Sequence, residues 1–453
     1  MAKEWIGNLI ARLHAGKISR REFAQRAGAL GLSATLIGQA MRAAPAAAQD
    51  ASPEAGGLIG QPGVEHITDT SKGTIRFYSS WPMIAASEQI GGDSKASVEM
   101  ALEDFGNAAG GFALEYEALD DAIAATGSWD SAKEAENANL VVNDLDAMVY
   151  IATYNSGAAA ISIPILNEAD PGPMAMISPA NTAPGLTKDS EFNAEGEPEK
   201  FYPTGIRNYM RVVPADDLQG PAGANWAYNT LGARTAYVLH DRQLYGEGVA
   251  TFFRDAFERL GGEIAGFEGF DADSPDYQSL MTSIANAGPD IVYVGAIVNL
   301  NPGKLLQDMR SLMPADQVAF LGPDGLVNQA FIDGAGDAAE GAYVTFAGLP
   351  PNALEGAGAD WYTRIRERLG HEPDAYSLYA YEAAVVAIQG VDKVGEKDRP
   401  AILDAMFSTE GFQGLLGEWS FTETGDTSLT IVSLNVIQDA GITFQEEIAP
   451  PAS

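Results

Sequence analysis

Residues 234–260 read RTAYVLHDRQLYGEGVATFFRDAFERL. The opening run, Arg234 to His240, is short, mostly apolar and rich in strand-forming residues, as in a buried strand. After a polar turn, apolar residues recur at helical spacing and share one face: Val249, Phe252, Phe253, Ala256, Phe257 and Leu260. A strand followed by a helix with one apolar face predicts a βα unit, in which helices cover a sheet.

The same alternation continues on both sides of this unit. Strands are predicted at 74–79, 112–116, 147–151, 173–177, 290–294 and 317–321. Helices are predicted at 131–143 and 158–168, and where Val98, Ala101, Leu102 and Phe105 share a face. This order is typical of parallel sheets covered by helices, and about 380 residues exceed one core. We therefore expect an α/β protein with two lobes, whose ligands bind at the carboxyl ends of the strands.

Composition narrows the functional classes. The chain has 453 residues, 27 basic and 62 acidic side chains and a formal charge of −35, which argues against nucleic acid as a partner. It has no cysteine and only four histidines, and none of the histidines has metal-ligand spacing. Phosphate-binding loops, nucleophile elbows and dinucleotide fingerprints are absent from the sequence. We expect no metal, no cofactor and no catalytic centre.

The first 48 residues have the order of an export signal. Basic residues precede an apolar run, Ala27 to Met41, and small residues follow it up to Ala48. Ser19-Arg20-Arg21-Glu22-Phe23 resembles the twin-arginine signal, and an ordinary secretory signal is the alternative. Residues 49–72, rich in Gly and Pro, are expected to form a flexible lead-in. The exported chain is expected to be periplasmic and monomeric.

Polar residues follow two neighbouring predicted strands. Tyr154-Asn155-Ser156-Gly157 opens one helix, and Ser178-Pro179-Ala180-Asn181-Thr182 follows the next strand. Backbone N–H groups at a helix N-terminus, with the positive end of the helix dipole behind them, suit a carboxylate. Each loop taken alone is equally well a helix cap or a turn.

Several segments, in order, resemble the type I periplasmic binding proteins, specifically the leucine/isoleucine/valine-binding family of ABC transporters. They are Met176 to Thr182, Leu239 to Gly248, Phe320-Leu-Gly-Pro-Asp-Gly325 and Asp337 to Thr345, within a similarity from about Thr74 to about Ile437. The resemblance implies two Rossmann-like lobes, 73–214 with 346–422 and 215–345 with 423–445. It also implies three crossovers, near 214–219, 342–348 and 421–428, and a hinge that closes over the ligand.

The resemblance also implies the roles of site residues. In the first lobe, Asn155 and Ser156, with Ala180, Asn181 and Thr182, would hold a ligand carboxylate. In the second lobe, Tyr245 would pack over the ligand and Asp324 would pair with its ammonium group. Tyr154 and Ile297 would shape the pocket, and Trp81 would roof it or belong to the core.

Three departures from the family pattern concern the ligand. Asp324 stands where the family usually has Glu, Ile297 or Val298 where it commonly has Tyr, and the family disulfide is missing. The leading hypothesis is a receptor that delivers a branched-chain or related amino acid to an ABC permease. Alternatives are a receptor for an amide, urea or small carboxylate, a ligand sensor for a membrane kinase, and an exported enzyme.

Overall fold

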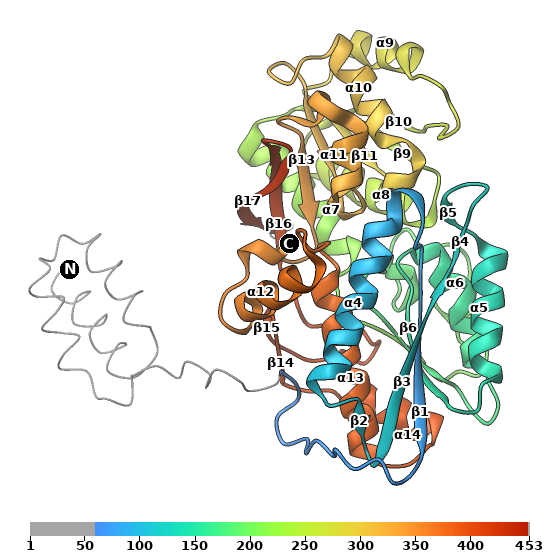
Figure 1. Ribbon diagram of the computed structural model, residues 1–453. Helices are drawn as coiled ribbons and strands as arrows, with labels where there is room; N and C mark the ends of the chain where they lie inside the picture. Colours follow the sequence, from blue (N-terminus) through green and yellow to red (C-terminus); the bar gives the residue numbers. More distant parts are fainter. Residues whose placement is uncertain (1–58, 452–453) are drawn as a thin grey trace, which may run out of the picture. The chain divides into compact units, whose positions relative to one another are not determined.

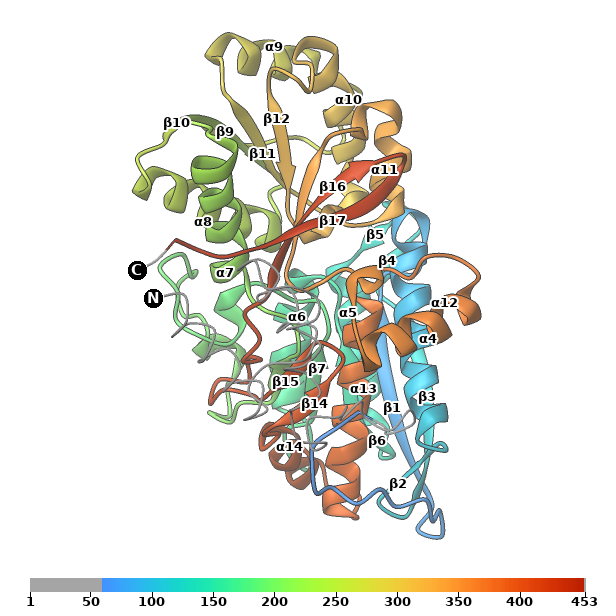
Figure 2. The same ribbon diagram turned by 90° about the vertical axis from the view of Figure 1, so that its left-hand side faces the viewer.

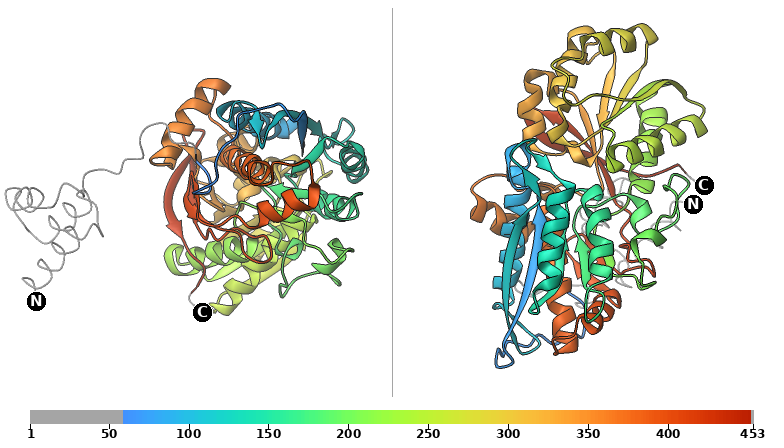
Figure 3. Two further views of the ribbon diagram at one scale, coloured as in Figure 1. Left: turned by 90° about the horizontal axis from the view of Figure 1, so that it is seen from below. Right: turned by 90° about the vertical axis from the view of Figure 1, so that its right-hand side faces the viewer.

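The structure is a computed structural model that describes residues 59–451. The expected export signal at 1–48 and residues 49–58 of the expected lead-in lie outside the described residues. Residues 59–451 contain two lobes, each built around one large sheet (Figures 1 and 3). Within this range, no helix combines the length and apolar character needed to cross a bilayer.

Lobe 1 is built on a six-stranded sheet covered on both faces. Its pairings are parallel except β2 with β3, and its order is β2 (Ala108–Ala109), β3 (Phe112–Asp120), β1 (Thr74–Trp81), β6 (Ala147–Ala152), β7 (Ala175–Ser178) and β8 (Tyr209–Arg211). Ile75 and Phe77 of β1 enter one core cluster and Tyr78 enters another, because alternate side chains of a strand point to opposite faces. The covering helices are α4 (Glu88–Asp104), α13 (Ser377–Val394) and α14 (Arg399–Phe407), and α5 (Ser131–Asn143) and α6 (Ser156–Asn167).

Lobe 2 is built on a seven-stranded sheet. Its order is β10 (Glu263–Gly269), β9 (Thr235–His240), β11 (Ile291–Gly295), β12 (Ala319–Gly322), β13 (Tyr343–Phe346), β16 (Val432–Gln438) and β17 (Gly441–Ile448). Both sheets are mostly parallel. In the sheet of lobe 2, β16 pairs antiparallel with β13 and with β17. The helices are α7 (Asp216–Asn225), α8 (Leu244–Arg259), α9 (Gln278–Ala287), α10 (Pro302–Leu312) and α11 (Gln329–Ala335), while α12 (Ala357–Leu369) packs against α4.

The stretch 234–260 folds as its pattern predicts. Arg234 to His240 becomes β9, and the apolar face of α8 is buried against the sheet. The helix begins at Leu244, before its first patterned residue, because the polar turn after β9 is only three residues long. Tyr245 therefore lies in the first turn of α8, at the carboxyl edge of the sheet.

The lead-in prediction is wrong for residues 59–72. Gly60 pairs with Gln413, and Ile59 is buried in the core. The side chain of His66 lies 2.9 Å from the Asp392 carboxylate, and Ile67 N donates to the same carboxylate at 3.1 Å. Glycine and proline gave the segment a linker composition, but its few apolar and polar side chains are enough to fix it on lobe 1.

Three segments connect the lobes: 212–215, 347–356 and 420–431. The expected lobe boundaries need two small corrections, since Phe346 belongs to β13 and β17 runs past residue 445 to Ile448. The loops that follow β6, β7, β9, β11 and β12 lie where the two lobes meet (Figure 2). This is the edge at which ligands of parallel sheets bind.

Candidate ligand-binding site

A cavity between the lobes brings most of the predicted residues together. It is small, about 10 Å³, and is lined by Tyr154, Asn155, Ser156, Ala180 and Tyr376 from lobe 1 and by Tyr245, Ile297 and Gly325 from lobe 2. Asp324 lies directly beside it, hydrogen bonded to two of the lining tyrosines. Thr182 and Asn181 follow Ala180 in the same buried loop. Sequence segments more than 200 residues apart therefore form one small site.

The wall from lobe 1 starts with the loop between β6 and α6. Asn155 is the N-cap residue of α6, with an extended backbone, and its side chain does not cap the helix. Its buried Oδ1 atom has no hydrogen-bond partner within residues 59–451. The Ser156 hydroxyl accepts a hydrogen bond from Ala183 N at 3.3 Å. The loop thus presents a helix N-terminus and one unpaired polar atom at the cavity.

The loop after β7 completes this wall. Thr182 is 1% exposed, and its hydroxyl has no hydrogen bond of good geometry in the described part of the chain, although it lies next to the Asp216 carboxylate. Asn181 has a different position. Its Nδ2 donates to the carbonyl oxygens of Thr153 and Tyr154, both at 2.9 Å, and its Oδ1 accepts from the Tyr209 hydroxyl at 3.1 Å. Asn181 therefore joins the two lobe 1 loops to each other, and its hydrogen bonds are directed into the protein.

The wall from lobe 2 is built around the Asp324 carboxylate, which is 1% exposed. Asp324 begins a short 3₁₀ helix (Asp324–Leu326) directly after β12. Its Oδ1 accepts from Gln219 Nε2 at 2.9 Å and from the Tyr245 hydroxyl. The same tyrosine hydroxyl accepts from Gly325 N at 2.9 Å, and Gln219 Oε1 accepts from Asp324 N at 3.0 Å. Tyr245 and Gln219 thus fix both the carboxylate and its backbone.

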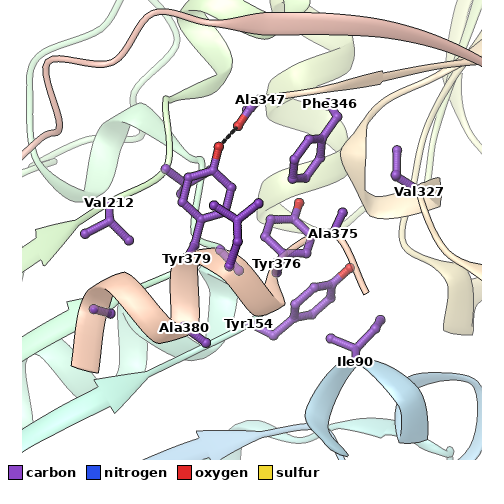
Figure 4. Close-up of a cluster of buried hydrophobic side chains, with 14 of the residues drawn as sticks. Ile90, Tyr154, Val212, Val327, Phe346, Ala347, Ala375, Tyr376, Tyr379 and Ala380 are labelled. Atoms are coloured by element: carbon purple, nitrogen blue, oxygen red, sulfur yellow. Dashed lines mark hydrogen bonds between the residues drawn. The ribbon is translucent and has the colours of Figure 1, made fainter. Parts of the chain in front are cut away.

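Tyr376 of lobe 1 reaches the same carboxylate from across the cavity. Its hydroxyl donates to Asp324 Oδ2 at 2.5 Å, and its ring meets that of Tyr154 edge-on at 5.4 Å. Figure 4 shows these two rings together with Phe346 of β13, whose ring lies 5.3 Å from Tyr376. The lobes are therefore closed in this structure, with aromatic rings from both of them in contact.

The charges of the site are negative and deeply buried. Burial raises the pKa of Asp324, while hydrogen bonds from Tyr245, Tyr376 and Gln219 oppose this rise. Burial raises the pKa of Asp216 well above its ordinary value, and the charge of Asp324 raises it further. Gln219 Nε2 donates to both carboxylates, at 2.9 Å to Asp324 and 3.2 Å to Asp216. The pKa of Asp324 is raised less than that of Asp216, because more hydrogen-bond donors surround the Asp324 carboxyl group.

A third buried acid positions Ile297. Asp241, directly after β9, accepts from Ile297 N at 3.0 Å and from Gln243 N at 2.9 Å. Burial raises its pKa to about 6. Because one carboxylate ties the loops after β9 and β11 together, the side chains of Tyr245 and Ile297 are held on the same wall.

Trp81 is placed away from the cavity lining. It is 1% exposed and belongs to the large hydrophobic cluster that includes Phe77 and Ile90. As the last residue of β1, it lies on the same face of the strand as Ile75 and Phe77. The indole that contacts lobe 2 is that of Trp129, which packs against Tyr245, Val249 and Ile297.

Sequence reasoning missed Gln219, Tyr376 and Trp129. Gln219 lies in the first turns of α7 and Tyr376 directly before α13, so neither follows a strand of the predicted sheets. The only available signal was their local polarity or aromaticity, which many surface positions share. Their place at the site depends on how the lobes close, and no local pattern encodes this.

Similarity to known proteins agrees with this architecture. A sequence profile of the family described as periplasmic binding protein matches residues 80–436. The chain belongs to the periplasmic binding protein family. The matched range runs from the end of β1 into β16 and contains every residue of the cavity lining, so the family assignment covers the site as well as most of the fold.

Two relatives of this periplasmic binding protein illustrate the family. The leucine-, isoleucine-, valine-, threonine- and alanine-binding protein of Pseudomonas aeruginosa is 28% identical over 357 residues, which are 78% of this chain and 87% of the relative. The Leu/Ile/Val-binding protein homolog 2 of Brucella abortus is 28% identical over 355 residues, 77% and 86% of the two chains.

Solved structures share the fold. The leucine-binding protein LivK of Thermotoga maritima has a TM-score of 0.72 at 24% identity, covering 83% of this chain and 99% of its own. LivJ of Streptococcus pneumoniae, in complex with isoleucine, has a TM-score of 0.70 at 19% identity, covering 83% and 100%. A solute-binding protein of an ABC transporter from R. palustris, in complex with benzoate, has a TM-score of 0.69 at 18% identity, covering 84% and 98%. The two-lobed α/β fold expected from the sequence is confirmed.

Proposed function

We propose that this periplasmic binding protein is the receptor of an ABC importer and captures a branched-chain or related amino acid between its lobes. The observation that carries the proposal is the pair of unlike walls around one closed cavity. Lobe 1 supplies neutral polar groups at a helix N-terminus, and lobe 2 supplies a buried carboxylate. These are the groups that suit the two charged ends of an amino acid.

The ligand carboxylate is assigned to lobe 1. The backbone N–H groups at the start of α6 and the unpaired Thr182 hydroxyl can donate to it. A partner for the Thr182 hydroxyl removes the cost of a buried, unsatisfied polar group. Asn181 is assigned a positioning role, because its amide is already engaged with Thr153, Tyr154 and Tyr209.

The ligand ammonium is assigned to Asp324. An ionised carboxylate offers about four acceptor positions, and Gln219, Tyr245 and Tyr376 use three of them. Two of these bonds are on Oδ1 and one is on Oδ2, so one position is left on Oδ2. No cationic side chain pairs with Asp324 among the described residues, so a ligand cation supplies the charge that the buried acid lacks.

A small aromatic carboxylate is the second candidate. The R. palustris protein with benzoate shares the fold, and another structure from Rhodopseudomonas palustris contains p-hydroxybenzoic acid. The cavity lining includes the rings of Tyr154, Tyr245 and Tyr376, which can pack against an aromatic ligand. This candidate uses the lobe 1 wall in the same way but leaves Asp324 without a cation.

The cellular setting follows from the family and the N-terminal sequence. We assign the protein to the periplasm, with residues 1–48 as its export signal and Arg20-Arg21 as a twin-arginine pair. We further assign it an ABC permease as partner, a monomeric state and no catalytic step. Replacing Arg20 and Arg21 with lysine should block export if the twin-arginine route is used and leave it intact if the signal is an ordinary secretory one. Co-purification with a membrane kinase instead of a permease would identify a sensor.

Calorimetric titration tests the proposal. L-amino acids, amides and small carboxylates, including benzoate, are titrated into the purified protein and into Asp324→Ala. The proposal expects tight binding of an aliphatic L-amino acid that Asp324→Ala removes. Binding of benzoate alone, unaffected by Asp324→Ala, would establish the second candidate instead.

A further inference from the structure

A two-stranded hairpin of lobe 1 reaches lobe 2 beside the cavity. It consists of β4 (Ala122–Ile123) and β5 (Ser128–Trp129), follows β3 and leads directly into α5. In Figure 1 it lies at the end of lobe 1 that meets lobe 2. One hydrogen bond joins its turn to lobe 2: Asn299 Nδ2 donates to Gly127 O at 2.6 Å. Asn299 is itself held by the Ser87 hydroxyl of lobe 1, which donates to its Oδ1 at 2.6 Å.

Trp129 at the end of this hairpin touches both walls of the site. On lobe 2 it packs against the cluster of Tyr245, Val249 and Ile297, two of which line the cavity. On lobe 1 it lies against the backbone of Gly157, where a Cβ atom would come within 2.7 Å of the indole Cζ2. Gly157 is the second residue of α6 and follows the ligand-facing Asn155 and Ser156.

A hinge opening of the two lobes would break the contact of Trp129 with lobe 2. Trp129 is partly buried, and its lobe 2 partners are carried by α8 and by the loop after β11. Opening the hinge would return the indole and the faces of Tyr245 and Ile297 to water. Closing the lobes therefore buries aromatic and aliphatic surface, and opening them exposes it again.

We infer that Trp129 is a positioning residue that locks the closed form and sets how slowly the ligand leaves. This rests on the proposed function, since slow release matters only for a protein that captures a solute. Trp129 acts through Tyr245 and Ile297, against which it packs and both of which line the cavity. Its loss opens the closed form more often, so release accelerates while association, which begins from the open form, changes little.

The first test compares kinetic constants for L-leucine by stopped-flow fluorescence. We expect Trp129→Ala to raise the dissociation rate constant about tenfold and to change the association rate constant less than about twofold. Trp129→Phe should restore most of the slow release, because a smaller ring still reaches the cluster. Phe267→Ala is the matched control: this partly buried aromatic packs within lobe 2 near Arg254 and His240, and its loss should leave release unchanged.

The second test needs no ligand, so failure of the proposed function and failure of this inference can be separated. The chain has no cysteine, and Glu136→Cys on α5 with Asn286→Cys on α9 places one dye on each lobe. Single-molecule energy transfer then reports the closed fraction of the ligand-free protein. We expect Trp129→Ala to lower this fraction and Phe267→Ala to leave it unchanged. Equal closed fractions in the protein and Trp129→Ala would overturn the inference, as would equal dissociation rates for a ligand that binds.

Discussion

The two walls of the cavity differ in how far their polar groups are already hydrogen bonded. On lobe 1 the polar groups are neutral, and the Thr182 hydroxyl and Asn155 Oδ1 lack partners. On lobe 2 the carboxyl group of Asp324 is already held by Gln219, Tyr245 and Tyr376. Under the proposed function, lobe 1 would gain hydrogen bonds when a ligand binds, whereas lobe 2 is organised beforehand and would select the charge of the ligand.

The contrast between the walls would fail if lobe 1 carried a buried charge close to the cavity, and Asp374, which accepts a hydrogen bond from Tyr376 N, is the residue to test. Its Oδ1 accepts from Tyr376 N at 3.0 Å, and burial, with a smaller effect of Asp93, raises its pKa to about 7. Its folded-state pKa exceeds the ordinary value of 3.8, so the folded protein binds the proton more tightly and loses stability as pH rises. Between about pH 4 and about pH 8 this loss is roughly 4 kcal/mol.

Asp374→Asn keeps the acceptor for Tyr376 N and removes the titration. Urea unfolding at several pH values should show the variant more stable than the protein at about pH 8 and similar at about pH 4. The buried acids Asp241 and Glu382 titrate in both proteins, so the difference between the two curves isolates Asp374. Parallel curves would mean that Asp374 is ionised throughout and that lobe 1 is not neutral.

The charge-selecting role of lobe 2 is tested by Asp324→Ala. Loss of a buried partner of the ligand ammonium should weaken binding of an L-amino acid about 100-fold or more. Calorimetry measures the dissociation constant. The control is Asp337→Ala, which removes an exposed acid of the same lobe. An unchanged dissociation constant would mean that Asp324 only stabilises the turn after β12 and does not contact the ligand.

Preorganisation of lobe 2 predicts a stability effect without ligand. Tyr245→Phe leaves Gly325 N–H without its acceptor and removes one donor from Asp324, which should cost about 2 kcal/mol of unfolding free energy. Tyr154→Phe is the matched change on lobe 1, where the hydroxyl makes no hydrogen bond within residues 59–451, and its unfolding curve should barely move. Equal losses of unfolding free energy in the two variants would show that lobe 2 is no more preorganised than lobe 1.

The smallest effect is expected at Thr182. Thr182→Val removes an unpaired hydroxyl and keeps the shape of the side chain, so the ligand-free protein should lose no stability. Binding of a carboxylate ligand should weaken about fivefold to tenfold through loss of one hydrogen bond. Thermal unfolding and titration of the same sample separate the two effects, and a fall in melting temperature would show that the hydroxyl already has a partner.

Much of this structure is encoded locally. The apolar runs that became β1, β6, β9 and β11 and the faces of α4 and α8 follow from side-chain periodicity, which is a property of short segments. Asn155, Ser156 and Ala180 could be proposed as site residues because loops after parallel strands share one edge of a sheet. Asp324 and Tyr245 came from the family resemblance.

Local sequence patterns could not predict which residues of the two lobes contact each other. Tyr376 reaches Asp324 from 52 positions away in the sequence, and Gln219 from 105. Of the two places expected for Trp81, the structure shows the core, and Trp129 is the indole beside the cavity, although both tryptophans end strands of lobe 1. The difference lies in direction, because Trp81 continues the inward face of β1 whereas a hairpin carries Trp129 out towards lobe 2.

One titration tests the central claim most directly. L-leucine is compared with 4-methylpentanoate, which has the same carbon skeleton and carboxylate but no ammonium group. The account predicts that L-leucine binds and closes the lobes, and that the analogue binds about 100-fold more weakly or not at all. Equal binding of the two, or binding of the analogue alone, would contradict the assignment of Asp324 as the site of a ligand cation.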